Sequence, residues 1–264
     1  MLYNTNDTFV GRSLQAYGEW SEPESFLFQQ IIREGDVVVE AGANIGSHTV
    51  GLSKAVGLAG IVHAFEPQRH TFQLLCANLS LNECFNVFAY PHAVGSENKT
   101  ISFPVADPTV TNNFGASSLH LTDCPTEAIS MRTLDSMNFP RLDLLKVDIE
   151  GFEVDMLAGA RTTISTCRPV VYLEYMNPYN GDNSKVFVEY FSDLRYDLYY
   201  YITPIFNSRN YFGNEVNHFA GLWSFDMLCL PKEKAVVEGM LDARKDVGHC
   251  SDPELWRQVK FKYF

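Results

Sequence analysis

The feature that most constrains this chain is the alternation, between residues 37 and 175, of short apolar runs with apolar residues at helical spacing. Residues 37–40 form a β-branched run, and a clear amphipathic helix follows the second such run, at 72–79. Strands that alternate with helices indicate βαβ units in a mainly parallel sheet that is covered on both faces. Seven strands are predicted, at 37–40, 61–65, 86–90, 142–149, 169–175, 198–202 and 221–230, with a further helix at 183–194.

Composition narrows the function classes. The chain has 264 residues, 46% of them hydrophobic, and a formal net charge of −12. Such a chain can bury a full core. Its acidity argues against nucleic acid and against an anionic membrane surface as partners, because both require clustered Lys and Arg. With scattered cysteines, no signal peptide and no apolar run of about 18 residues, the sequence predicts a reduced, cytoplasmic protein.

A glycine loop follows the first predicted strand. Glu40 ends that strand, and Gly42 and Gly46 lie four residues apart, so the Gly-x-Gly-x-x-Gly spacing of a dinucleotide site is absent. Gly42 lets the backbone turn sharply and approach a ligand closely. Glu40 can accept a hydrogen bond from a cationic group, so an ammonium-bearing ligand fits this loop better than a pyrophosphate does.

The second predicted strand also ends in an acid. Glu66 lies 20 residues after Gly46, and Pro67 then stops the strand. A carboxylate in this position accepts two hydrogen bonds from a ribose diol. Together with the glycine loop, Glu66 indicates a nucleoside that carries an amino-acid tail, as S-adenosylmethionine does. The alternative is a tight turn between strand and helix, with Glu66 facing solvent.

The fourth predicted strand runs into three acids, Asp148, Glu150 and Glu153. Carboxylates crowded at one strand end raise one another's pKa values unless a cation compensates them, and a sulfonium cofactor or a metal ion could do so. Glu153 also has a structural explanation, because an acid in the first turn of a helix stabilises its dipole. A Mg²⁺-type site would need Asp148, Glu150 and Glu174 to converge, and we do not favour a metal.

Four motifs resemble those of the FkbM-type S-adenosylmethionine-dependent methyltransferases, within a likeness that covers about residues 22–230. The resemblance implies a Rossmann-like class I methyltransferase fold, doubly wound around a mainly parallel seven-stranded sheet, and methylation of hydroxyls on glycans or small metabolites. The family more often has Asp where Glu40 stands, and an aromatic residue at the place of His48. The motifs are Val39-Glu40-Ala41-Gly42-Ala43-Asn44-Ile45-Gly46 with Thr49, Ala64-Phe65-Glu66-Pro67, Thr133-Leu134-Asp135-Ser136, and Leu145-Lys146-Val147-Asp148-Ile149-Glu150-Gly151-Phe152-Glu153.

The resemblance also divides the chain and its site. Residues 36–230 are predicted to be the methyltransferase domain, residues 1–35 an N-terminal extension that packs on it, and residues 231–264 a helical C-terminal extension. The predicted cofactor-binding residues are Glu40, Gly42, Ala43, Asn44, Gly46, Thr49, Glu66, Pro67 and Asp148.

Catalytic and acceptor-binding residues are predicted at the rim of the sheet, which is the edge formed by the carboxyl ends of the parallel strands. Asp148 is the first candidate for the reacting end, through either the cofactor's amino group or the acceptor hydroxyl. His218 is a second candidate base, although a loop histidine can simply be solvated. Aromatic and amide side chains suit a sugar, whose apolar face stacks on rings, but Asn also favours turns. The predicted acceptor-binding residues are Glu174, Asn177, Tyr179 and Tyr211.

The sequence thus predicts an S-adenosylmethionine-dependent O-methyltransferase that acts on a small molecule or a glycan. A nucleotide-dependent oxidoreductase shares the strand-end acid, but the glycine spacing disfavours it. A binding module without turnover is the other alternative. Residues 1–35, 107–131 and 203–218 fit neither strand nor helix period well, and long irregular stretches of this kind are expected to be functional loops or disordered. Neither the acceptor nor the oligomeric state follows from the sequence.

Overall fold

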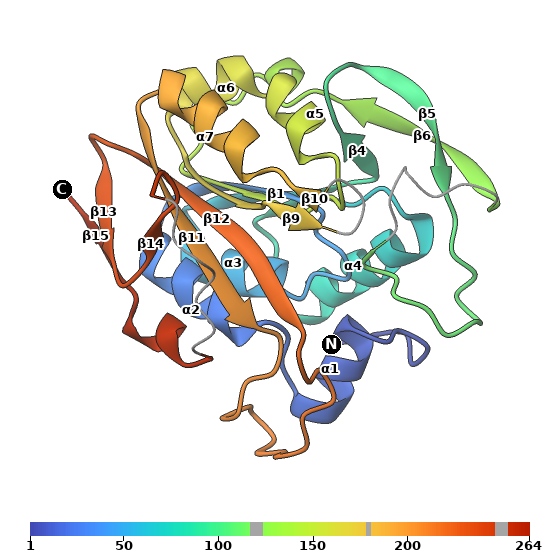
Figure 1. Cartoon of the computed structure of the whole chain (residues 1–264). Coiled ribbons are helices and arrows are strands. Elements are labelled where there is room, and N and C mark those ends of the chain that lie inside the picture. Colours follow the sequence, from blue (N-terminus) through green and yellow to red (C-terminus); the bar gives the residue numbers. More distant parts are fainter. Residues whose placement is uncertain (117–123, 178–180, 246–252) are drawn as a thin grey trace.

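The computed structural model describes residues 1–116, 124–177, 181–245 and 253–264. Its centre is an eight-stranded sheet with the order β14-β11-β12-β8-β7-β1-β2-β3 (Figure 1). Neighbouring strands pair in parallel along the row β8-β7-β1-β2-β3, and β12 pairs antiparallel with both β8 and β11. The predicted doubly wound, mainly parallel sheet is confirmed, and β14 adds a two-residue edge. The strands are β1 Val37–Ala41, β2 Ile61–Phe65, β3 Val87–Tyr90, β7 Leu144–Val147, β8 Val170–Glu174, β11 Tyr196–Pro204, β12 Trp223–Pro231 and β14 Leu241–Asp242.

Helices cover both faces of this sheet (Figure 1). Neighbouring residues of β1 face opposite ways, because Val38 joins the core beneath α2 and α3, whereas Val39 joins the core beneath α5, α6 and α7. Burial on both faces explains why β1 is a continuous apolar run rather than an alternating one. The helices are α2 Glu22–Ile31, α3 Thr49–Val56, α4 Arg69–Leu81, α5 Glu153–Ala158, α6 Arg161–Cys167 and α7 Ser184–Asp193.

One predicted helix, lined by residues 156 to 164, is two helices in the structure. The chain breaks between α5 and α6 at Gly159, where an added Cβ would lie 2.1 Å from the carbonyl oxygen of Gly95. The carboxylate of Asp135 accepts hydrogen bonds from the backbone N–H groups of Thr162 and Thr163 and so satisfies the first turn of α6. A periodic stripe cannot reveal this break, because both helices keep their apolar side chains on the core.

A second, three-stranded sheet lies beside α4 and α5. β6 Thr126–Arg132 pairs in parallel with β4 His92–Val94 and antiparallel with β5 Lys99–Pro104. The prediction of an irregular segment over 107–131 is therefore wrong from residue 126 onward. Within 107–116 the chain pairs with the N-terminal segment, since Thr8 N–H donates to the Asn112 carbonyl at 2.9 Å. That segment leads into α1 Val10–Tyr17.

The prediction of a helical C-terminal extension is wrong for the described part of 231–264. β13 Ala235–Glu238 pairs antiparallel with β15 Lys260–Tyr263, and a short 3₁₀ helix, η2 Leu255–Gln258, precedes β15. Buried and exposed residues alternate along β13, which is the period of a strand. A further two-stranded ribbon joins β9 Met176–Asn177 to β10 Gly181–Asp182. None of the described helices is long and apolar enough to cross a membrane.

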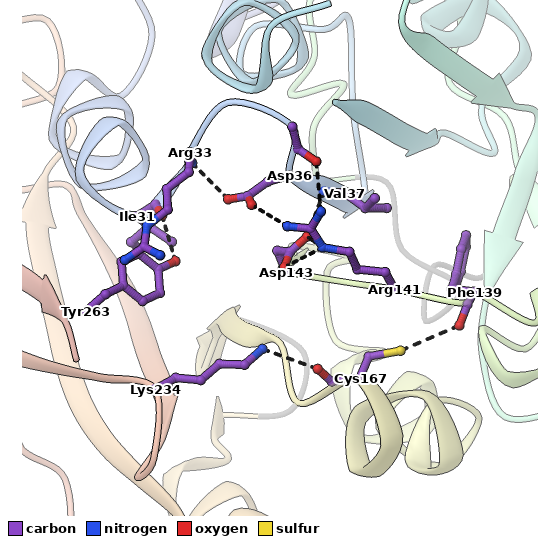
Figure 2. A network of polar contacts seen from close by, with 11 residues as sticks. Ile31, Arg33, Asp36, Val37, Phe139, Arg141, Asp143, Cys167, Lys234 and Tyr263 are labelled. Atoms are coloured by element: carbon purple, nitrogen blue, oxygen red, sulfur yellow. Dashed lines mark hydrogen bonds and ion pairs between the residues drawn. The ribbon is translucent and has the colours of Figure 1, made fainter. Parts of the chain in front are cut away.

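A polar network ties the amino ends of β1 and β7 together, on the side of the sheet away from the strands' carboxyl ends (Figure 2). The Arg141 guanidinium donates to Asp36 at 2.9 Å and lies 2.8 Å from Asp143, whose carboxylate also accepts the Val37 N–H. Asp36 is buried, and this burial raises the pKa of its carboxyl. Arg141 therefore compensates two neighbouring carboxylates.

Replacing Arg141 by alanine is expected to destabilise the fold modestly. The variant removes the cation that pairs with both Asp36 and Asp143, but the Arg141 side chain is 56% exposed, so solvent screens part of the loss. We expect a loss of about 1 kcal/mol, which corresponds to roughly 2–4 °C in thermal unfolding for a chain of this size. Arg141→Lys should recover part of it, and an unchanged melting temperature for Arg141→Ala would show that the network contributes nothing.

Candidate active site

A cavity of about 240 Å³ opens at the carboxyl ends of the parallel strands. In an open α/β sheet this edge is where ligands bind. Most of the residues predicted from the sequence meet here, although they come from different strands and the loops after them. The predicted residues on the cavity lining are Glu40, Gly42, Ala43, Asn44, Glu66, Pro67, Asp148 and Glu174.

The glycine loop is shaped by packing against the neighbouring strand. Gly42 has a φ of +84°, and an added Cβ would lie 1.8 Å from the backbone carbonyl oxygen of Asp148. The backbone that Gly42 approaches so closely is therefore the end of β7. Gly46, with a φ of +87°, lies outside the lining, and an added Cβ there would lie 2.9 Å from Leu75 Cδ1. Both glycines are required by the turn itself.

Glu40 is deeply buried, with 1% of its surface exposed. Thr49, which is itself outside the lining, donates its hydroxyl to Glu40 Oε2 at 2.6 Å. Burial raises the pKa of Glu40 to about 7, against the opposing effects of Lys146 and Thr49. A cationic group placed beside Glu40 would favour its ionised form, so this position suits an ammonium.

Glu66 holds the loop and faces the cavity at once. Its two carboxylate oxygens accept the backbone N–H groups of Asn44 at 3.0 Å and Gln68 at 2.8 Å. Burial raises the pKa of Glu66 to about 7, although both of these hydrogen bonds act to lower it. A carboxylate has about four lone-pair sites, so capacity remains for hydroxyl donors. The Gln68 side chain donates to the Phe114 carbonyl at 2.8 Å and so joins the rim to the 105–116 loop.

Lys146 is a functional candidate that the sequence analysis did not assign. It is 1% exposed, lines the cavity, and places Nζ 3.4 Å from Asp148 Oδ2 and 4.0 Å from Glu40 Oε1. Burial acts to lower the pKa of Lys146, but Asp148, Glu40 and the other nearby acids outweigh it and raise that pKa. The signal was available, since a lysine inside an otherwise apolar buried strand requires a partner.

Glu24 and His48 form a second pair that the sequence analysis did not assign. Ser21 donates its hydroxyl to Glu24 Oε1 at 2.6 Å, and His48 Nε2 lies 3.4 Å from Glu24 Oε2. Burial, followed by the charge of Asp226, raises the pKa of Glu24 to about 8. Burial and the charge of Lys146 hold the pKa of His48 well below its usual range. His48 is therefore a neutral imidazole on the cavity lining.

The three remaining acids divide into one structural group and two that line the cavity. Glu153 accepts the backbone N–H groups of Ile149 and Gly151, both at 3.2 Å, and so holds the turn before α5. Burial, followed by the charge of Asp148, raises the pKa of Glu150 to about 8 and that of Glu174 well above its usual range. Among the described residues, no three His, Cys, Asp or Glu side chains are arranged to hold a metal ion.

His218 and Tyr211 are not brought to this cavity. His218 is exposed and lies 3.2 Å from Arg12 Nη2 through its Nδ1 atom. Tyr211 is 81% exposed and lines a separate surface groove with Trp256 and Arg257. Asn177 belongs to the short strand β9, and Tyr179 lies outside the described residues.

Apolar side chains from distant segments complete the lining. They come from the N-terminal segment, from the loop that ends near Phe114, and from the ends of β11 and β12. They lie in irregular stretches or at the first residue of a helix or strand, and they share one lining only in the folded chain. They are Phe9, Val10, Trp20, Phe114, Ile205, Leu222 and Trp223.

The chain is similar to several known proteins. The family described as Methyltransferase FkbM domain matches residues 40–211. Methyltransferase 1 of Beauveria bassiana is 29% identical over 143 residues, which cover 46% of this chain and 57% of that protein. The hexuronic acid methyltransferase AglP of Haloferax volcanii is 28% identical over 145 residues, which cover 55% of this chain and 58% of that protein.

The matched part thus spans less than two thirds of either curated relative. Among solved structures, methyltransferase FkbM from Methylobacillus flagellatus KT superposes with a TM-score of 0.47 at 18% identity, covering 78% of this chain and 50% of that one.

Proposed function

Because this chain belongs to the FkbM methyltransferase domain family, we propose that it is an S-adenosylmethionine-dependent O-methyltransferase that acts on a hydroxyl of a sugar, a glycan or a small metabolite. One observation carries the proposal: Glu40, Glu66 and the Gly42 turn, which lie on consecutive parallel strands and the loop between them, meet on one cavity. Two buried carboxyls beside a tight turn suit a nucleoside that also carries an ammonium group.

The cofactor's groups can be assigned to residues of this chain. Glu66 would accept the ribose hydroxyls, and Glu40 would accept the α-ammonium group. Asp148 lines the same cavity, where its Oδ2 atom lies 3.4 Å from Lys146 Nζ. When bound, S-adenosylmethionine would supply an electrophilic methyl group on a sulfonium. The match to the residues rests on the donor and acceptor chemistry of the lining.

The protein's part in the reaction is alignment, exclusion of water and proton transfer. Alignment of two reactants can supply about 7–11 kcal/mol of a barrier. A base that takes the proton from the acceptor hydroxyl adds roughly 10²–10⁴ in rate. We propose Asp148 for the contact with the reacting end. Trp20 and Trp223 line the same cavity and would exclude water from it.

The acceptor class rests on two supports. AglP is named for a hexuronic acid, so a sugar acceptor has a precedent in a similar protein. In this chain, aromatic rings and carboxyls share the lining, and that mixture suits a ring with one apolar face and several hydroxyls. We therefore propose a sugar unit.

Titration calorimetry with S-adenosylhomocysteine tests the cofactor assignment. We expect the wild-type protein to bind S-adenosylhomocysteine and not NADH. Glu66→Ala should weaken this binding by about 1–3 kcal/mol, because the ribose hydroxyls lose their acceptor and the loop loses two backbone contacts. Glu66→Gln keeps one acceptor oxygen and should lose less.

Glu238→Ala, in the remote strand β13, is the control and should bind like the wild type. Binding of NADH in place of S-adenosylhomocysteine would support the alternative that the protein is a nucleotide-dependent oxidoreductase. Unchanged affinity in Glu66→Ala would remove Glu66 from the cofactor site.

A further inference from the structure

The carboxyls on the cavity lining far outnumber its cations. The lining carries the acids Glu24, Glu40, Glu66, Asp148, Glu150 and Glu174. Lys146 is the only Lys or Arg among the described lining residues, and the residues outside the described ranges include neither type. Lys146 is already paired with Asp148 and Glu40. An anionic ligand would therefore find no free cation on this lining.

Among the acids that the proposed cofactor site leaves over, Glu174 has unused hydrogen-bonding capacity. Glu174 Oε2 is buried and has no hydrogen-bond partner among the described residues. The raised pKa values of Glu24 and Glu150, both about 8, have burial as their first cause and neighbouring acids as the next. This lining thus disfavours negative charge, and an anionic ligand would meet the same unfavourable conditions as an ionised carboxyl does.

His48, on the same lining, is a second and independent indication of a ligand. It is 6% exposed, and neither ring nitrogen makes a hydrogen bond within the described structure, although Nε2 lies 3.4 Å from Glu24. A buried polar group without a hydrogen bond is costly, so a partner is expected. A neutral imidazole accepts at one nitrogen and donates at the other, which matches a hydroxyl group.

Resting on the proposed function, we infer that the acceptor is a sugar unit that presents hydroxyl or ammonium donors and carries neither a carboxylate nor a phosphate. Such a unit offers donors to Glu174 and His48, and its apolar face can stack on Trp20 or Trp223. A hexuronate or a sugar phosphate would instead bring a negative charge to a lining whose described residues offer it no free cation. The acceptor inferred for this chain therefore differs in charge from the hexuronic acid for which AglP is named.

The test compares matched acceptors that differ at one ring substituent, which is neutral, cationic or anionic. Methyl glycosides of glucose, galactose and mannose are each assayed as the neutral hexoside, the 2-amino-2-deoxyhexoside and the hexuronide. Formation of S-adenosylhomocysteine gives kcat/KM for each. We expect a neutral or amino form to exceed the hexuronide of its own series by about tenfold or more. A hexuronide that equals or exceeds its neutral form would overturn the inference.

Glu174→Gln connects the discrimination to this lining. The substitution keeps the volume and one acceptor oxygen but replaces an ionisable carboxyl with an amide that can donate to a carboxylate, so the preference for the neutral over the uronate form should fall several-fold. Glu189→Gln makes the same replacement on an exposed part of α7 and should leave the ratio unchanged. An unaltered ratio in Glu174→Gln would contradict the assignment.

The two proposals fail in different ways. If calorimetry detects no binding of S-adenosylhomocysteine, the proposed function fails and the acceptor inference fails with it. If S-adenosylhomocysteine binds but no neutral or amino hexoside is methylated, the cofactor site stands and the inferred acceptor class is wrong.

Discussion

Replacing Gly42 by alanine is expected to lower the free energy of unfolding by about 3 kcal/mol or more, which corresponds to roughly 6–12 °C in thermal unfolding. Two causes act together. The φ of +84° is unfavourable for any residue with a Cβ, and that Cβ would lie 1.8 Å from the Asp148 carbonyl oxygen. Since this carbonyl is backbone, β1 and β7 must separate at the rim, and cofactor affinity should fall with stability.

Two other glycines separate these causes. Gly213 has a φ of +65° with no atom within 4 Å of an added Cβ, so Gly213→Ala measures the backbone conformation alone, at about 1–2 kcal/mol. Gly51 lies in α3 with open space around it, and Gly51→Ala should stabilise the protein by about 0.5–1 kcal/mol. If Gly42→Ala costs no more than Gly213→Ala, the close approach to Asp148 has no energetic weight.

Replacing Lys146 by methionine is expected to cost about 3–5 kcal/mol, the usual loss when one partner of a buried ion pair is removed. Glu40 and Asp148 would then share the rim without their cation. Lys99→Met is the matched control, because Lys99 pairs with Glu97 on the surface and exposes 46% of its side chain. That control should change stability by less than about 1 kcal/mol.

The loss in Lys146→Met should depend on pH. Lys146 acts to lower the pKa of Glu40, which is about 7 in the wild type, so removing Lys146 raises it further. A carboxyl with a raised folded pKa binds its proton more tightly in the native state, and its stabilising contribution is present below about pH 4.5 and lost as pH rises through the folded pKa. The gap between wild type and variant should therefore widen from pH 5.5 to pH 8.5. A gap that stays constant or narrows would show that Lys146 does not interact with these acids.

The rim acids could be predicted because each follows a strand within a few residues. Glu40 and Glu66 follow short apolar segments that can be recognised as strands from neighbouring residues alone. The rule that ligands bind beyond the carboxyl ends of parallel strands needs no knowledge of distant contacts either. The close approach that makes Gly42 necessary was predicted for a ligand, whereas the structure shows backbone instead. A motif can predict that a glycine adopts a positive φ, but it cannot predict which group packs against that glycine in the folded chain.

The other side of the cavity could not be predicted in this way. Glu24 precedes the first strand, and Trp223 begins β12, so some 200 residues separate two groups that share one lining. His218 and Tyr211 belong to a loop whose composition suits a site, yet the chain turns them elsewhere. Composition describes what a loop could bind, whereas its anchoring contacts decide where it lies.

The sequence by itself determined the parallel sheet, the family and the acids at two strand ends, because periodicity and strand-end motifs are local properties of the chain. Only the tertiary structure decided that Lys146 pairs with those acids, that Glu24 and His48 join them, and that β13 and β15 form strands. These outcomes depend on contacts between residues far apart in sequence, where burial and charge are set by whichever segments pack together.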